Sequence, residues 1–341
     1  MNDNSLTQNA LVQRMFQISA AFVDARALWM FAELGIADVL QGEAKSVAEL
    51  AKAVLVPEDS VQRVLRVVAG SGIVTEVEPG RFRLTPMGSL LRADDPASMR
   101  DWVRWSGGPI FDSFRDALHS IRTGKPVFEK VHGVQMYQYL GEHPEDARVF
   151  GGAMLAYSRE VSAALMNFQQ FRESRRVVDV GGGIGTLALT ILRAFPNMRA
   201  TVFDLPHVAE RTKSLPAIQE FADRCDIVGG DFFKSVPDGG DVYMLSAILH
   251  NWTNEECVVI LRNIRRALPK GRLLLLEMLI PNSDAPHFAK VTDLVMLVAL
   301  GGRERTQQEY AALLDQGGFR LVRVHSTPYA VQLLEAEPVG P

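Results

Sequence analysis

The chain has 341 residues, of which 47% are hydrophobic, and a formal net charge of -4 at pH 7. This length accommodates two domains with large cores. The acidic balance disfavours nucleic acid as a partner, because binding to a phosphate backbone requires a positive surface. Cys225 and Cys257 match neither a disulfide framework nor a zinc-ligand spacing, and we expect no bound metal.

The start of the chain lacks the features of an exported protein. Residues 1–10 have neither the basic start nor the apolar stretch of a signal peptide, and no apolar run in the chain is long enough to cross a bilayer. We therefore expect a cytoplasmic protein without a membrane partner.

A long helical pattern over residues 8–40 is apolar on more than one face and includes Leu11, Phe16, Phe22 and Phe31. A helix that is hydrophobic nearly all round must be covered on both sides. At the start of a chain the cover is often another subunit. We expect a homodimer formed through these N-terminal helices.

Residues 46–85 have a winged-helix-like pattern. Ser46 and Glu49 form a capping box that begins one helix, Pro57 begins a second, and residues 73–85 read as a hairpin around a Pro–Gly turn. Such a module either reads DNA or serves for packing. We favour packing, because acidic residues offset the arginines of the second helix.

Three regions follow from these patterns: a winged-helix-like dimerisation domain at 1–105, a helical linker and substrate-pocket region at 106–170, and an α/β domain at 171–341. Short apolar runs separated by helical segments mark the strands of the last region, at 175–181, 198–205, 225–233, 240–249 and 271–280. Such runs indicate a parallel sheet covered on both faces, which is a Rossmann-like, doubly wound α/β fold. A helix and two final strands follow.

The glycine-rich segment VVDVGGGIG follows the first strand, and a helix is expected to begin at Thr186. Glycines let the backbone turn sharply and approach a ligand that lies beyond the carboxyl ends of the strands. Gly181, Gly183 and Gly185 form G-x-G-x-G, which differs from the G-x-G-x-x-G of dinucleotide sites and suits an adenosyl group without a pyrophosphate. This spacing disfavours the rival hypothesis of an NAD-dependent dehydrogenase.

Acidic residues end the next two strands. Asp204 is placed where a carboxylate can accept both hydroxyls of a ribose. Asp231, beside Phe232, is placed where a carboxylate can accept an adenine amino group while a ring covers the base. A glycine loop and two acids at successive strand ends together predict a nucleoside-type cofactor.

A second constellation is expected at the same edge of the sheet. His250 follows the fourth strand, Glu277 ends the fifth, and Glu304 begins a helix after the glycine pair at 301–302. A carboxylate can orient an imidazole and stabilise its charged form, which favours a catalytic histidine over an ordinary core histidine.

The segments VVDVGGGIG, FDLP, GGDFF, LHNW, LLLLEMLIP and GGRERT occur in this order along the chain. With them, residues from about 10 to 335 resemble the plant caffeate and flavonoid O-methyltransferases and their bacterial antibiotic- and pigment-tailoring relatives. The resemblance implies S-adenosyl-L-methionine as the cofactor, an N-terminal dimerisation domain and a C-terminal methyltransferase domain. It also implies that His250 is the general base, flanked by Glu277 and Glu304. The residues implied at the cofactor are Gly181, Gly183, Asp204, Leu205, Asp231, Phe232, Ser246 and Trp252.

The chain departs from the family pattern near the histidine. Asn251 and Asn254 stand where the family commonly has aspartate, and Ser246 stands where the plant enzymes have lysine. None of these changes removes a group that methyl transfer requires. If the first aspartate tunes the histidine or touches the acceptor, we expect its loss to change the choice of substrate, and we expect Ser246 to contact the cofactor with less positive charge than a lysine.

The expected acceptor is a phenol-like hydroxyl of a small aromatic molecule. A phenol, with a pKa of about 10, is protonated at neutral pH, and a histidine with a pKa of about 6.5 can accept its proton. The residues expected to line the acceptor pocket are Trp105, Phe111, Phe150, Met154, Tyr157 and Met296. The alternatives are methylation of nitrogen or sulfur, a non-methylating reaction on the same fold, and a ligand-sensing regulator whose winged helix binds DNA.

Overall fold

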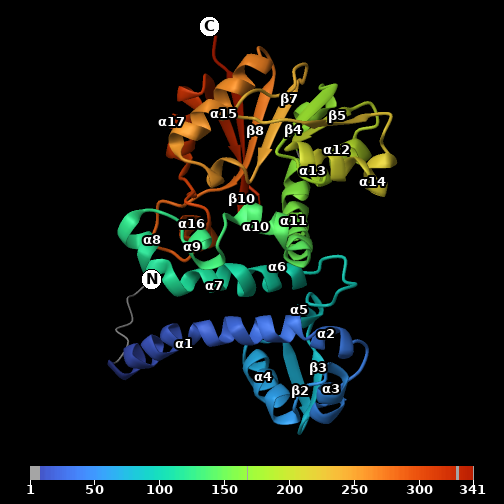
Figure 1. The fold of residues 1–341 in the computed structure, drawn as a ribbon, viewed down its shortest axis with the longest axis vertical. Helices are drawn as coiled ribbons and strands as arrows, with labels where there is room; N and C mark the ends of the chain where they lie inside the picture. Colours follow the sequence, from blue (N-terminus) through green and yellow to red (C-terminus); the bar gives the residue numbers. More distant parts are fainter. Residues whose placement is uncertain (1–7, 167, 328–329, 341) are drawn as a thin grey trace. The chain divides into compact units, whose positions relative to one another are not determined.

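The computed structural model describes residues 8–166, 168–327 and 330–340. The chain divides into two compact units, one of Met1–Arg115 with Leu140–Ala156 and one of Asp116–Tyr139 with Tyr157–Pro341 (Figure 1). Residues of the predicted middle region, 106–170, are shared between the two units. Helix α11 (Pro144–Leu165) begins in the first unit and ends in the second.

The first unit contains the elements of the winged-helix-like pattern. Helices α3 (Val47–Val54) and α4 (Glu58–Gly70) precede a hairpin of β2 (Val74–Glu78) and β3 (Arg81–Leu84). Strand β1 (Lys45–Ser46) pairs antiparallel with β3 and completes a sheet of order β1-β3-β2. The other elements of this unit are α1 (Gln8–Glu33), α2 (Ile36–Val39), α5 (Pro86–Ser89), α6 (Arg100–Trp105), the π-helical turn η1 (Ser106–Ile110) and α7 (Phe111–Ser113).

Local signals explain where these elements begin. The Ser46 hydroxyl accepts a hydrogen bond from Glu49 N at 3.2 Å, and the Glu49 carboxylate accepts one from Ser46 N at 2.7 Å, which confirms the predicted capping box. The buried face of α4 supplies Val61, Leu65 and Val68, spaced three or four residues apart as a helix requires.

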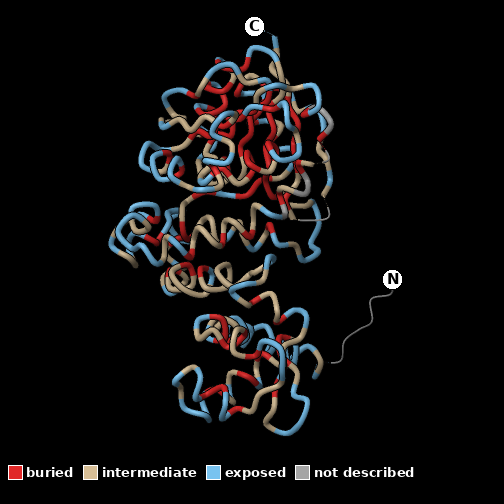
Figure 2. Tube along the Cα trace, turned by 90° about the vertical axis from the view of Figure 1, so that its right-hand side faces the viewer, coloured by how far each residue is buried: buried red, intermediate tan, exposed pale blue. Residues whose placement is uncertain are grey.

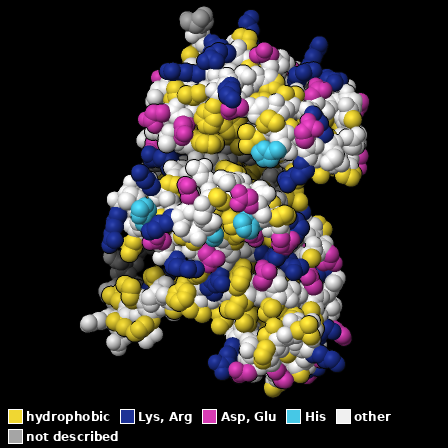
Figure 3. Space-filling view, in the orientation of Figure 1, with side chains coloured by type: hydrophobic (Ala, Val, Ile, Leu, Met, Phe, Trp, Pro, Cys, Tyr) yellow, Lys and Arg dark blue, Asp and Glu magenta, His cyan; other side chains and the backbone are white. Residues whose placement is uncertain are grey.

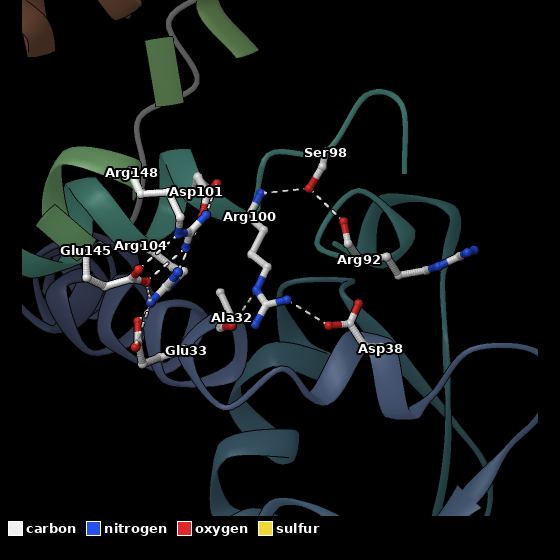
Figure 4. A network of polar contacts seen from close by, with 10 residues as sticks. All are labelled: Ala32, Glu33, Asp38, Arg92, Ser98, Arg100, Asp101, Arg104, Glu145 and Arg148. Carbon is white, nitrogen blue, oxygen red and sulfur yellow. Dashed lines mark hydrogen bonds and ion pairs between the residues drawn. The ribbon is translucent and has the colours of Figure 1, made fainter. Parts of the chain in front are cut away.

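An ion-pair network joins α1 to α6 within this unit (Figure 4). Arg104 of α6 donates to the Glu33 carboxylate at 2.8 and 3.1 Å and to Glu145 at 3.3 Å. Arg100 donates to Asp38 at 2.7 Å. Because the guanidinium of Arg104 is largely buried and bidentate, these contacts stabilise more than isolated surface pairs do, and they fix the end of α1.

Helix α1 leaves most of its hydrophobic side chains exposed. In the chain alone, only Ala27, Phe31 and Ala32 of this helix are buried. Hydrophobic side chains accordingly lie along the part of the surface that α1 occupies (Figure 3). The exposed large hydrophobic residues of α1 are Leu11, Val12, Met15, Phe16, Ile18, Phe22, Val23 and Met30.

The second unit is built on a sheet of order β6-β5-β4-β7-β8-β10-β9. Its strands are β4 (Arg176–Val180), β5 (Arg199–Asp204), β6 (Cys225–Gly229), β7 (Val242–Ser246), β8 (Arg272–Met278), β9 (Phe319–His325) and β10 (Val331–Pro338). The five predicted strands pair in parallel, whereas β10 is antiparallel to both β8 and β9, so the complete sheet is mixed.

Alternate residues of the strands face two separate cores. Val177 of β4 packs in a cluster with α12 (Thr186–Ala194), and the next residue, Val178, packs in a cluster with α15 (Asn254–Ala267) and α17 (Gln307–Gln316). Figure 2 shows the buried segments concentrated in the interior of this unit, and the strands β4, β5, β7 and β8 are buried over most of their length. Helices therefore cover both faces of the sheet, which confirms the predicted doubly wound α/β architecture.

Shorter helices complete the second unit. They are α8 (Ala117–Thr123), α9 (Phe128–His132), α13 (Pro206–Lys213), α14 (Pro216–Gln219), α16 (Phe288–Ala299) and the turns η3 (Gln169–Arg172) and η4 (Leu249–Asn251). Helix α10 (Met136–Glu142) and the turn η2 (Phe114–Asp116) each have residues in both units. Within the described parts of the chain, no helix combines the length and the hydropathy needed to span a bilayer.

Candidate active site

The glycine-rich loop joins β4 to α12 in a left-handed backbone conformation. Gly181, Gly183 and Gly185 have φ angles of 73°, 56° and 79°. A side chain at Gly181 would lie 2.5 Å from Ile248, whereas a Cβ at Gly183 would meet nothing within 4 Å. The loop thus requires glycine for its conformation and leaves open space at its centre, as the sequence predicted for a cofactor loop.

Asp204 lies beside this loop at the end of β5. One oxygen of its carboxylate accepts a hydrogen bond from Gly183 N at 2.8 Å, and the other accepts from Leu205 N at 2.7 Å. Burial raises the pKa of Asp204. Each oxygen keeps a further lone pair, so the carboxylate can still accept the hydroxyls of a ribose. The Thr212 hydroxyl, which sequence reasoning missed, donates to Gly183 O at 3.0 Å and supports the loop.

Aromatic side chains gather near the same loop. Phe232 and Phe233 meet the Trp252 ring edge-to-face, with centroids 6.0 and 4.8 Å apart. Asp231 lies two residues beyond the end of β6 rather than on the strand, and it accepts a hydrogen bond from Phe233 N at 2.9 Å. The indole N–H of Trp252 is buried and has no hydrogen-bond partner among the described residues.

These observations test whether the residues fit an adenosyl cofactor. The glycine loop offers open space, Asp204 offers free lone pairs, and the Trp252 indole offers an unused donor. Hydroxyl groups and a heteroaromatic base require these partners, and we conclude that the residues fit. Ser246 is the last residue of β7 at the same edge of the sheet.

His250 lies on the short turn after β7, between two carboxylates. Its Nδ1 is 2.9 Å from Glu304 Oε1 and 3.8 Å from Glu277 Oε2. The other oxygen of Glu277 accepts a hydrogen bond from Leu249 N at 2.9 Å. Both carboxylates are fully buried, and the imidazole is 15% exposed. The structure therefore brings together the three residues that the sequence predicted to converge, from positions far apart in the chain.

The carboxylates change the protonation of the imidazole. Burial alone lowers the pKa of His250, but the charges of Glu277 and Glu304 outweigh it and raise the pKa to about 9. Burial raises the pKa of Glu277 to about 7. The protons belong to the group as a whole. The two carboxylates therefore favour the cationic imidazole, whereas the mechanism expected from the sequence used the ordinary pKa of histidine.

Glu304 does not begin a helix, contrary to the sequence prediction. Thr306 and Glu309 form the capping box of α17, which leaves Glu304 in the preceding loop. Its backbone N–H donates to Asp293 at 2.8 Å, and the next residue bridges to Leu279 in parallel. This extended loop directs the Glu304 side chain into the interior.

The glycine pair before Glu304 has a packing role that the sequence did not reveal. A Cβ at Gly302 would lie 2.1 Å from the carbonyl oxygen of His250. The next residue, Arg303, donates its N–H to the same oxygen at 2.8 Å. Only glycine allows the two loops to approach this closely.

The three residues also offer a possible set of metal ligands, because Nδ1 and the carboxylate oxygens lie within 4.8 Å of one another. The 2.9 Å contact between Nδ1 and Glu304 is, however, a direct charge-assisted hydrogen bond. An imidazolium between two carboxylates also balances much of their charge. We interpret the group as an ion-paired imidazole.

The residues predicted for the acceptor pocket belong to both units. Trp105, Phe111, Phe150 and Met154 lie in the first unit, and Tyr157 and Met296 lie in the second. Within the first unit, the rings of Trp105 and Phe150 meet edge-to-face at 5.1 Å, and Arg26 lies 4.6 Å above the Phe111 ring. The pocket itself stays a prediction.

Comparison with known proteins agrees with the fold and shows the family. A family model described as an O-methyltransferase domain matches residues 111–320, and one described as an O-methyltransferase dimerisation domain matches residues 16–94. The phenazine O-methyltransferase PhzM of Lysobacter antibioticus is 40% identical over 95% of this chain and 96% of its own length.

Solved structures show the same likeness. The crystal structure of LaPhzM, with 40% sequence identity, has a TM-score of 0.90 and covers 96% of this chain and 99% of its own. CalO1, a methyltransferase in calicheamicin biosynthesis solved in its SAH-bound form, has 31% identity and a TM-score of 0.87 and covers 98% of this chain and 100% of its own.

The matched domains and the Rossmann-like sheet define a methyltransferase, a cofactor-dependent class of transferase. The chain belongs to the O-methyltransferase family. It is an S-adenosylmethionine-dependent O-methyltransferase with an O-methyltransferase dimerisation domain.

Proposed function

We propose that His250 is the general base that accepts the proton of a phenol-like hydroxyl while a small aromatic molecule is methylated. The observation that carries this proposal is the 2.9 Å contact between His250 and Glu304 at the sheet edge that also holds the glycine loop. A phenazine O-methyltransferase among the relatives supports an aromatic, secondary-metabolite acceptor.

The protein contributes alignment and proton transfer. S-adenosylmethionine, when bound, supplies an electrophilic methyl group on a sulfonium. Holding the acceptor oxygen in line with that methyl can supply about 7–11 kcal/mol of the barrier. Glu304 fixes the imidazole by accepting its Nδ1–H, which leaves Nε2 to take the acceptor proton. Such assistance contributes about 10²–10⁴-fold.

The cofactor contacts follow from the groups around the glycine loop. We assign the ribose hydroxyls to Asp204 and the adenine amino group to Asp231. Phe232 and Trp252 supply the aromatic walls for the base. The remaining proposed contacts are those of Gly181, Gly183, Leu205 and Ser246.

The acceptor pocket and the homodimer belong to the same proposal. A flat apolar ring suits Tyr157 and Met296, the two predicted pocket residues in the unit that carries His250. The exposed hydrophobic residues of α1 lie in and next to the matched dimerisation domain, which supports a homodimer formed through this helix.

The test of the base is His250→Ala. We expect turnover of a methylatable phenol or hydroxyphenazine, found by mass-spectrometric screening, to fall by about 10²–10⁴-fold. Affinity for S-adenosylhomocysteine, measured by calorimetry, should stay within a few-fold of the wild type. His143→Ala, at an exposed position before α11, is the matched control and should keep full turnover. Near-normal turnover of His250→Ala would refute the proposed role.

A further inference from the structure

A buried arginine adjoins the histidine and its carboxylates. Arg305, the residue after Glu304, is 0% exposed. Its guanidinium donates to Leu249 O at 3.0 Å and to Trp252 O at 2.8 Å, which are the carbonyls on either side of His250. It also donates twice to the side-chain oxygen of Asn254, at 3.1 and 2.9 Å.

Arg305 is one of several groups that hold the histidine turn in place. The turn begins at Ala247. Its φ of 53° lies in the left-handed region of the backbone, which residues other than glycine rarely adopt. The Asn251 amide donates to Ala247 O at 3.0 Å, a contact that an aspartate carboxylate could not make. Arg305 fixes the other end of the turn through the two carbonyls. Both departures from the family's aspartates therefore have structural consequences.

Among the described residues, no carboxylate is in direct contact with the guanidinium of Arg305. In the described part of the chain, its hydrogen bonds to oxygen all go to neutral groups, and its further side-chain partner is the neutral thiol of Cys257. No carboxylate among the described residues forms an ion pair with Arg305 within 4.0 Å. A buried charge is normally paired with an opposite one. Asn254 occupies the place of such a partner, and its amide binds the guanidinium without neutralising it.

This charge acts on the imidazole and its neighbours. The ionisable groups around the imidazole are Glu277 of β8, Glu304 and Arg305 of the loop before α17, Asp293 of α16, Cys257 of α15 and Tyr310 of α17. The carboxylates favour the protonated imidazole, whereas the positive charge of Arg305 opposes it and lowers the pKa of His250.

We propose that Arg305 is a positioning residue that holds the turn bearing His250, and that Asn254 leaves the charge of Arg305 active against the protonated imidazole. A carboxylate at position 254 would neutralise the guanidinium and favour the imidazolium. The amide thus keeps more of the imidazole in the form that accepts a proton. This inference rests on the proposed role of His250 as the base.

The first test is Asn254→Asp, with the full-length protein and isotope-labelled histidine. We expect the NMR titration of His250 to move to higher pH by about half a unit or more, because the new carboxylate pairs with Arg305. The matched control is Asn197→Asp, which adds the same charge in an exposed loop at the opposite edge of the sheet. Equal shifts in the two variants would overturn the electrostatic part of the inference.

The second test is Arg305→Lys. This variant keeps the positive charge but replaces the planar guanidinium, whose N–H groups reach several acceptors at once, with a single ammonium group. We expect kcat to fall by at least about tenfold, because the histidine turn is no longer fixed, and affinity for S-adenosylhomocysteine to fall less, because only the Trp252 carbonyl links Arg305 to the proposed cofactor contacts. A wild-type kcat in this variant would remove the positioning role. The titration of His250 in Asn254→Asp does not depend on turnover. A fully active His250→Ala would therefore refute the role of His250 as the base, but it would not decide whether Arg305 lowers the pKa of His250.

Discussion

At His250, the buried carboxylates set the pH at which the imidazole can accept a proton. Glu277 and Glu304 raise the pKa of His250 to about 9, so the neutral base is the minor form at pH 7 and its fraction increases as the pH rises. The positive charge of a bound sulfonium opposes protonation and moves this equilibrium toward the neutral imidazole.

We predict that kcat/KM rises with pH and levels off once the pH exceeds the pKa of His250, which is about 9. Glu304→Gln removes one negative charge and should move this limb of the profile to lower pH, because the imidazolium loses stabilisation. The measurement is kcat/KM between pH 6 and about 10 with one acceptor for both proteins, so that acceptor ionisation is common to both. Identical profiles would show that the limb belongs to the acceptor rather than to His250.

The loop from Gly301 to Arg305 shows how one element serves several functional groups. Gly302 leaves room for the carbonyl of His250, and Glu304 pairs with the imidazole of the same residue. Arg305 donates hydrogen bonds to the carbonyls of Leu249 and Trp252. Each contact depends on the same extended path of the backbone. The loop should therefore tolerate change poorly even where its side chains do not touch a ligand.

Gly302→Ala tests this element. The added Cβ would lie 2.1 Å from the carbonyl oxygen of His250, so one of the two loops must move. We expect a loss of stability of about 1–3 kcal/mol together with a loss of turnover. Urea unfolding and kcat are the measurements. Gly141→Ala, in α10 and with nothing within 4 Å of the added Cβ, should leave stability unchanged or slightly increased. Wild-type stability of Gly302→Ala would contradict the close packing.

At the scale of the whole molecule, α1 determines the assembly that we propose. A row of exposed leucine, methionine and phenylalanine side chains is costly in water and is the usual sign of a protein interface. The match of a dimerisation domain to residues 16–94 agrees with this interpretation.

Phe16→Asp should convert the homodimer to a monomer, because the charge would be buried at the interface without a partner. Phe16 is 66% exposed in the single chain, so the substitution does not disturb the core of its own unit. Sedimentation velocity at several protein concentrations is the measurement. Val77→Asp, at an exposed position of β2, is the control and should stay dimeric. A dimeric Phe16→Asp protein would place the interface elsewhere.

Local sequence patterns were sufficient to predict most elements and the parts of the site that depend on neighbours in the chain. The Ser46–Glu49 capping box, the Gly181–Gly185 loop and the acid at Asp204 were predicted correctly, because capping, left-handed turns and strand ends follow local rules. The meeting of His250 and Glu277 followed from one further rule, that parallel strands end at the same edge of a sheet.

Which groups touch, and what charge they hold, depends on the packing of the complete fold. It placed Glu304 in a loop before the helix, paired it with a histidine 54 residues away, and put β10 antiparallel to β8. It also buried Arg305 beside a neutral partner. Burial and distant charges set these properties, because they depend on how segments far apart in sequence pack together. The sequence identified the histidine, and the packing of the fold fixed its protonation.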